Sequence, residues 1–154
     1  IKLFFEMLVN FPLMIAVASM TAAQIIKIAY YYFADGKFDL LHFFEAGGMP
    51  SAHSAMMTAL TISIGLTSGW TTTAFAISFI LSLVVMYDAM GVRRAASQQA
   101  FILNTLVDDM YATSGGKIEK LKEIMGHSPI EVVFGSILGA CVSLMFYFLI
   151  YLHI

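Results

Sequence analysis

Charged residues are scarce in this sequence: Asp, Glu, Lys and Arg make up 12% of its 154 residues, whereas 60% are hydrophobic. A soluble domain of this size needs more polar surface, so the composition indicates an integral membrane protein. The net charge is -2 and no basic tract is present, which argues against nucleic acid as a partner. The single cysteine, Cys141, lies in an apolar run and excludes an internal disulfide.

Long runs without charge predict about four membrane-spanning helices, because each crossing takes roughly 20 residues. The charge-free stretch 46–87 is too long for one crossing and contains GLTSGWTTT in its middle, which predicts a tight helical hairpin. The runs place the spans at residues 7–26 continuing to about 33, 54–65 with some extension at each end, 72–87, and 130 to the C-terminus.

Residues 88–127 form the one extended polar region. Two stretches in it, ASQQAFILNTLVDDMY and KIEKLKEIM, have helical patterns, so we expect an interfacial helical insertion between spans three and four. The chain is then a single transmembrane domain over residues 1–154, an all-α bundle. It begins at Ile1 rather than Met, so we expect further residues to precede it, and the first apolar run is too long for a signal-peptide core.

The basic residues indicate how the bundle is oriented. With four crossings, one of the eight Lys and Arg residues, Lys2, lies on one side of the membrane and seven lie on the other: Lys27, Lys37, Arg93, Arg94, Lys117, Lys120 and Lys122. The positive-inside rule makes the second side cytoplasmic and puts both termini outside. We therefore expect a cytoplasmic-membrane protein whose polar site faces the cytoplasm.

Four polar clusters converge on that side and together predict a phosphate site. Basic residues balance phosphate charge, glycines such as Gly47 and Gly48 allow a close backbone approach, and helix N-termini add N–H donors. Two histidines supply a nucleophile and a proton donor. The clusters are Lys27, the sequence Pro50-Ser51-Ala52-His53, the pair Arg93-Arg94, and Gly126-His127.

Two of these clusters carry a resemblance to a known superfamily. PSAHSA resembles the Pro-Ser-Gly-His motif of the type 2 phosphatidic acid phosphatases and vanadium-dependent haloperoxidases, with Ala52 in place of Gly. GHSPIEVVFGSILG resembles their third motif, His-x-x-x-Asp with spaced glycines, with Glu131 in place of Asp. Together with YDAMGVRRAASQQA, these motifs resemble the short divergent branch, the acid phosphatase/vanadium-dependent haloperoxidase-related membrane proteins, over essentially the whole chain.

The resemblance implies a role for each site residue. His127 would attack phosphorus to give a phosphohistidine, Glu131 would orient its imidazole, and His53 would protonate the leaving oxygen and later activate water. The phosphoryl oxygens would be held by Arg93, Arg94, Lys27, Ser51 and the backbone near Gly48. Asp88 is a candidate charge partner of a basic residue. The scheme requires no metal and no cofactor, and the substrate would be a lipid phosphate or a prenyl diphosphate in the surrounding lipid.

The sequence departs from the superfamily where a Ser-Arg pair should precede the nucleophilic histidine. Lys120 and Leu121 occupy those positions, whereas Arg93 and Arg94 end span three, 32 residues (95–126) before His127. We interpret this as a third motif split by an insertion, which requires His127 to return to the end of span three. Lys27 is the one candidate remnant of the first motif.

Other interpretations of the same residues stay open. Ser128-Pro129-Ile130-Glu131 is also a good helix start, so Glu131 is a cap in one reading and an orienting group in the other. Arg93-Arg94 is typical of a topology anchor. Asp108-Asp109 is compatible with a metal site, but the sequence offers no second cluster of ligands for it. The alternative function is a non-catalytic membrane protein that binds an anionic head group or a protein partner. A bundle this small buries little of its own surface, which is compatible with a homodimer.

Overall fold

The structure is a computed structural model that describes residues 9–35, 48–111, 121 and 126–151. Over these residues the chain forms helices and no strand, so the predicted all-α membrane fold is confirmed. The helices are α2 (Phe11–Asp35), α3 (Ala52–Ser68), α4 (Thr73–Met90), α5 (Val92–Tyr111) and α6 (Pro129–Tyr151).

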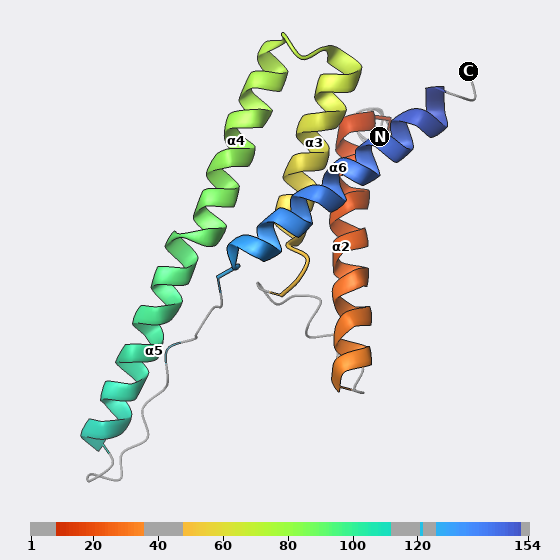
Figure 1. Cartoon of the computed structure of the whole chain (residues 1–154). Coiled ribbons are helices and arrows are strands. Elements are labelled where there is room, and N and C mark those ends of the chain that lie inside the picture. The colour runs from red at the N-terminus through yellow and green to blue at the C-terminus, as the bar shows by residue number, and fades with distance from the viewer. Residues whose placement is uncertain (1–8, 36–47, 112–120, 122–125, 152–154) are drawn as a thin grey trace, which may run out of the picture.

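The predicted spans correspond to α2, α3, α4 and α6. Among the described residues, three stretches are long and apolar enough to cross a membrane by length and composition: Phe11–Phe33, Thr73–Asp108 and Pro129–Ile150. The helix α3 is shorter, with 17 residues, but extends beyond the predicted 54–65 in both directions. It lies at the centre of the bundle, packed against α2, α4 and α6 (Figure 1).

Small residues let α3 and α6 approach closely. A Cβ atom added to Gly135 would collide with the carbonyl oxygen of Ser51, and one added to Gly139 would collide with that of Ala55. One turn further, the Ser143 hydroxyl donates to the Ala59 carbonyl at 3.0 Å. The two helices therefore run parallel with their backbones in contact, as in small-xxx-small packing of membrane helices.

The helix α2 packs against the same central helix in the opposite direction. The Ser19 hydroxyl donates to the Ala55 carbonyl at 3.2 Å, and Ala23 forms a buried cluster with Ala52 and Ala55. Lys27 follows Ala23 by one turn and is also buried, with 2% of its surface exposed. Because the helices are antiparallel, this spacing directs Lys27 toward the N-terminal end of α3.

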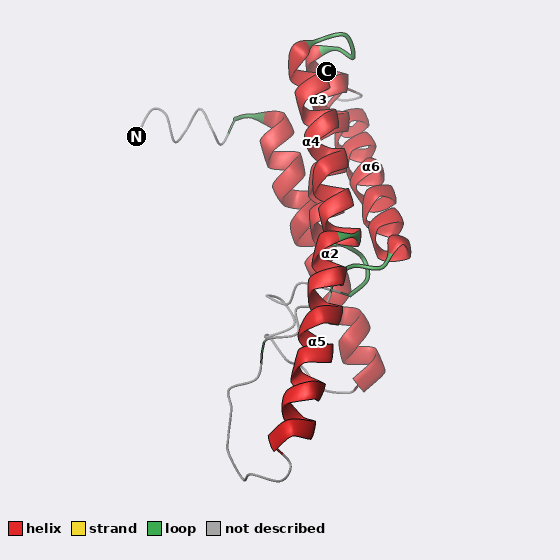
Figure 2. Cartoon of the chain, turned by 90° about the vertical axis from the view of Figure 1, so that its left-hand side faces the viewer, coloured by secondary structure: helices red, strands yellow, loops and turns green. Residues whose placement is uncertain are grey.

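The insertion begins with α5, which confirms a helix over ASQQAFILNTLVDDMY. It follows α4 after a break at Gly91 and extends beyond the bundle in nearly the direction of α4 (Figures 1 and 2). The second predicted helix, KIEKLKEIM, lies outside the described residues except for Leu121, which is not helical. The side-chain amide of Asn104 makes two hydrogen bonds with the Leu121 backbone. Its nitrogen donates to the Leu121 carbonyl oxygen and its oxygen accepts from the Leu121 nitrogen, each at 2.9 Å.

Candidate functional site

The side chains of His127 and Glu131 form the centre of the candidate site. The Nδ1 atom of His127 lies 2.8 Å from Oε2 of Glu131, and the histidine is 4% exposed. A carboxylate can only accept, so Nδ1 is the donor in this contact, and Nε2 carries the lone pair when the imidazole is neutral. The pair thus presents the ring nitrogen that a nucleophilic histidine needs.

Glu131 also contributes to the cap of α6, so the contacts that both interpretations require are present. Its Oε2 accepts a hydrogen bond from the Ser128 backbone nitrogen at 3.4 Å, and the Ser128 hydroxyl accepts one from the Glu131 nitrogen at 3.4 Å. These reciprocal bonds are a capping box. The contact with His127 is the shorter one, and both geometries follow from the position of Glu131 in the first turn of α6.

Two backbone hydrogen bonds join the motifs at this end of the bundle. The Ser51 nitrogen donates to the Glu131 carbonyl at 3.1 Å, which ties the start of α3 to the start of α6. The His127 nitrogen donates to the Ala89 carbonyl at 3.1 Å, near the end of α4. His127 therefore returns to the end of span three, as the split motif requires.

The PSAH motif forms the first turn of α3. Ser51 is the N-cap: its hydroxyl accepts from the Ser54 nitrogen at 3.3 Å and from the Ser54 hydroxyl at 2.9 Å. Ser51 is fully buried, whereas His53, two residues later, is exposed. The structure thus gives Ser51 a capping position and leaves the His53 side chain at the surface of the same helix end, where the helix dipole favours an anion.

The remaining predicted residues lie around this end, with different surroundings. Gly48 has φ +81°, and a Cβ atom there would lie 2.8 Å from the Tyr31 hydroxyl, so close packing with Tyr31 accounts for a glycine at this position. Asp88 is half-buried and directly precedes Ala89. Gly47 lies outside the described residues.

Arg93 and Arg94 lie in the first turn of α5 rather than at the end of α4. Gly91 separates the two helices, and its nitrogen donates to the Tyr87 carbonyl at 2.9 Å, which closes α4. The arginine side chains are outside the part of the chain that the structure describes. Their backbone nevertheless starts within a few residues of Ala89, the residue that binds the His127 nitrogen.

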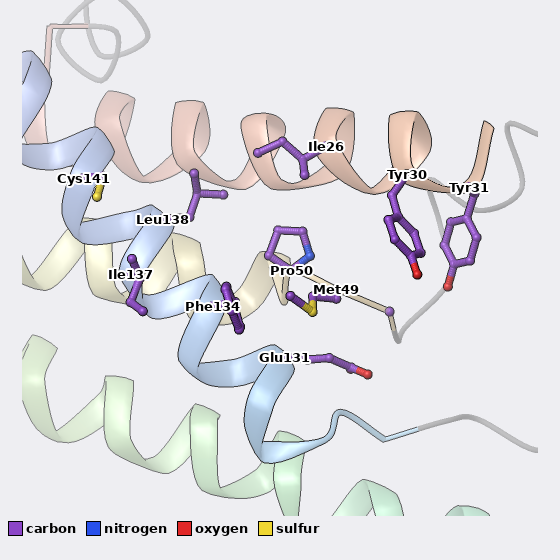
Figure 3. A pocket seen from close by; sticks show the side chains of 11 residues that line it. Ile26, Tyr30, Tyr31, Met49, Pro50, Glu131, Phe134, Ile137, Leu138 and Cys141 are labelled. Carbon is purple, nitrogen blue, oxygen red and sulfur yellow. The ribbon is translucent and has the colours of Figure 1, made fainter. Parts of the chain in front are cut away.

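A cavity of about 750 Å³ lies beside the pair, between α2 and α6 (Figure 3). Glu131 lines one end of it, and apolar side chains such as Phe134, Ile137 and Leu138 line the remainder. The site therefore combines a histidine–carboxylate pair with a neighbouring apolar space.

Comparison with known proteins identifies the family of this chain. A family model described as "Divergent PAP2 family" matches residues 8–142. The chain belongs to the divergent PAP2 family. It is also 40% identical over 151 residues to the uncharacterized membrane protein YuiD of Bacillus subtilis (strain 168), a match that covers 91% of this chain and 96% of that protein. No solved structure matches this chain.

The family assignment confirms the resemblance inferred from the two histidine motifs. The sequence patterns of this divergent PAP2 protein did not indicate three residues that lie at or near the candidate site. Tyr30 and Tyr31 line the cavity beside Glu131, and Asn104 binds the segment that leads back to His127. The tyrosines follow Lys27 by about one turn, a spacing that brings them to the same end of the bundle. No local pattern distinguishes Asn104 from the other polar residues of α5.

Proposed function

We propose that this divergent PAP2 protein is a membrane phosphatase that hydrolyses a phosphomonoester or diphosphate of a lipid through a phosphohistidine on His127. The observation that carries the proposal is the 2.8 Å contact between Nδ1 of His127 and Oε2 of Glu131. Three features of His127 hold its imidazole in one orientation: the bond from Nδ1 to Glu131, the burial of the side chain, and the hydrogen bond from the His127 backbone nitrogen to Ala89.

In the first step the Nε2 lone pair of His127 forms a bond to phosphorus, and the bond from phosphorus to the lipid oxygen breaks. His53 gives its proton to the departing oxygen, and Glu131 stabilises the positive charge of the phosphorylated ring. In the second step His53 takes a proton from water, the water oxygen bonds to phosphorus, and the N–P bond breaks to release phosphate. Atoms and charge balance without a redox partner.

Basic groups and helix ends would hold the phosphoryl oxygens during both steps. Lys27 is buried on the face of α2 that packs against α3. Arg93 and Arg94 lie in the first turn of α5, a few residues after Ala89. Ser51 and Gly48 belong to the segment that leads into α3. Such positioning accounts for most of phosphoryl-transfer catalysis, because the transferring group carries its charge on its outer oxygens.

Phosphate release from a panel of lipid phosphates and prenyl diphosphates, measured on the full chain in lipid nanodiscs, tests the proposal. We expect release by the wild-type protein and by His153→Ala, a histidine control, and none by His127→Ala. Acid-labile, base-stable labelling from a ³²P substrate should appear in wild type and disappear in His127→Ala. Full turnover by His127→Ala would reject the phosphohistidine, and loss of activity with EDTA would indicate a metal-dependent reaction instead.

The same experiment separates the enzyme from the alternative, a membrane protein that binds an anionic head group without turnover. Vanadate binding by the wild-type protein without phosphate release from any substrate would favour that alternative. We also propose that the site faces the cytoplasm. Labelling of Lys117→Cys and Ile154→Cys in a Cys141→Ser background should occur from opposite sides of sealed vesicles, and labelling of both from one side would reject this topology.

A further inference from the structure

The helix α5 exposes a row of large apolar side chains along one side. Ile102, Leu106 and Met110 are 57%, 52% and 72% exposed, and their spacing of four residues places them on one side of the helix. Val92 and Leu103 are also exposed, and all five side chains fall within about 100° of the helix circumference. These five residues are called the α5 stripe below.

The opposite side of α5 binds another segment of the chain. Asn104 is buried, and its side chain makes the two hydrogen bonds with the Leu121 backbone. Because successive residues of a helix are about 100° apart, Ile102 and Leu106 each point about 160° away from Asn104. The contact with Leu121 therefore occupies the side of α5 that is opposite the α5 stripe.

The α5 stripe begins on the side where α4 faces lipid. Val84 on α4 and Val92 on α5 are 58% and 60% exposed, and eight residues, just over two helical turns, separate them. Gly91, between the two helices, keeps an αR backbone, so the direction of the side chains carries over from α4 to α5. In a membrane protein the exposed apolar side of a spanning helix faces lipid. The α5 stripe thus continues the lipid-facing side of α4.

The two helices together are too long for one crossing. The 18 residues of α4 extend over about 27 Å, close to the roughly 30 Å of the hydrocarbon core. The 20 residues of α5 extend over about 30 Å more. If α5 continues nearly along α4, as in Figure 2, the α5 stripe leaves the bilayer and faces water. Such a row of apolar side chains is costly in water and is stabilised by an apolar surface.

A change of direction at Gly91 brings that surface within reach. Turning α5 outward from the bundle directs its lipid-facing side onto the membrane surface. The connection to the candidate site permits this turn, because the His127 nitrogen is bound at Ala89, two residues before Gly91. Asn104 follows Gly91 by 13 residues, about 20 Å along the helix, and this distance does not change when α5 turns about Gly91. The six residues from Leu121 to His127 extend up to about 20 Å, so they can bridge it in either direction of α5.

We infer that α5 docks on the surface of the bilayer that α4 spans, with the α5 stripe between the lipid head groups and the acyl chains. The inference needs only the membrane location of the chain and does not depend on the proposed phosphatase. The helix contains two arginines and two aspartates and so has no net charge. Burial of apolar surface therefore holds α5 on the membrane, and anionic lipid is not required. The sequence predicted an interfacial insertion, and the α5 stripe assigns the side of α5 that meets lipid.

A fluorescent probe at the far end of the α5 stripe tests the docking. Bimane is attached to Met110→Cys in the full chain with Cys141→Ser, in phosphatidylcholine nanodiscs that hold one copy each. The measurement is quenching by phosphatidylcholine that carries a doxyl group near the head group. Val84→Cys, on the lipid-facing side of α4, gives the reference for a probe in the bilayer. Met110 follows Met90, the last residue of α4, by 20 residues, so a straight continuation of α4 would hold the probe about 30 Å outside the membrane.

We expect quenching at Met110→Cys to reach at least about half of that at Val84→Cys, because a docked apolar face lies at the level of the doxyl group. Added phosphatidylglycerol should not increase it. Quenching below about a tenth of the reference would overturn the docking. If in that case a bismaleimide joined Met110→Cys of two copies in one nanodisc, the α5 stripe would be a contact between copies of this chain instead.

A matched pair of variants tests which side of α5 meets the membrane. Leu106→Glu and Phe101→Glu add the same charge at exposed apolar positions of one helix. Leu106 belongs to the α5 stripe, whereas Phe101 points about 140° away from Leu106. We expect Leu106→Glu to lower the quenching at Met110→Cys about threefold or more, and Phe101→Glu to leave it unchanged. Equal quenching in the two variants would overturn the assignment of the α5 stripe to lipid.

These outcomes are separate from those of the proposed function. Quenching at Met110→Cys in a protein that hydrolyses no substrate would reject the phosphatase and keep the docking of α5. Phosphate release by a protein whose Met110→Cys probe is not quenched would keep the phosphatase and reject the docking.

Discussion

The backbone nitrogen of Ser51 donates a hydrogen bond of 3.1 Å to the carbonyl oxygen of Glu131. This one bond joins the motif that contains His53 to the motif that contains His127, which are far apart in the sequence. Because Ser51 and Glu131 each lie at the start of a helix, the bond aligns the N-terminal ends of α3 and α6. A phosphate near these ends would meet two helix dipoles directed toward it.

The first prediction separates the two roles of Glu131. Glu131→Gln retains an oxygen that accepts from His127 and Ser128 but removes the charge that stabilises a positive imidazole. We expect turnover to fall about 10- to 100-fold, with little change in thermal stability. Glu131→Ala should in addition lower the free energy of unfolding by about 0.5–2 kcal/mol through loss of the cap. Wild-type turnover by Glu131→Gln would show that this glutamate is a cap alone.

The second prediction concerns the contact between α3 and α6. A methyl group at Gly135 would collide with the Ser51 carbonyl, which is backbone and cannot rotate away. We expect Gly135→Ala to destabilise the protein by about 1–3 kcal/mol and to lower phosphate release by displacing Ser51 from Glu131. Val133→Leu adds one methylene group on the exposed side of the same helix and should change neither. Equal melting temperatures for both variants in nanodiscs would contradict the close packing.

The third prediction tests how α5 is connected to Leu121, later in the same insertion. Asn104→Ala removes both hydrogen bonds to the Leu121 backbone and should cost about 1–3 kcal/mol at this connection. We expect faster hydrogen exchange of the Leu121 amide and lower phosphate release, because Leu121 precedes His127 by six residues. Thr105→Ala, at the exposed neighbouring position, should leave both unchanged. Unchanged exchange at Leu121 in Asn104→Ala would refute the connection.

The fourth prediction concerns the two arginines at the start of α5. Arg93→Lys or Arg94→Lys keeps the charge but loses the planar fork that grips two phosphate oxygens, so vanadate affinity should fall about tenfold for the arginine that faces the site. His127→Ala should instead remove turnover and leave vanadate binding largely in place. If neither arginine variant changes vanadate affinity while Lys120→Ala or Lys122→Ala does, the site is built from the insertion and the split-motif interpretation fails.

The helical architecture and the two histidine motifs follow from the sequence alone. Charge-free runs of span length admit only helices in a membrane, and the Ser128-Pro129-Ile130-Glu131 pattern specifies where α6 begins. The spacing of four residues between His127 and Glu131 also makes their contact a local property of one helix start. These features depend on neighbours in the sequence, and for that reason a sequence pattern is enough to predict them.

The tertiary structure decided what lies between the helices. The bond from His127 to Ala89 and the contact of Gly135 with Ser51 depend on how α3, α4 and α6 approach one another, which composition does not specify. The hydrogen bonds from the Asn104 side chain to the Leu121 backbone are a further case, because they join residues that lie 17 positions apart in the sequence. The cavity beside Glu131 likewise depends on how the elements pack, because its lining residues come from α2, from α6 and from the segment before α3.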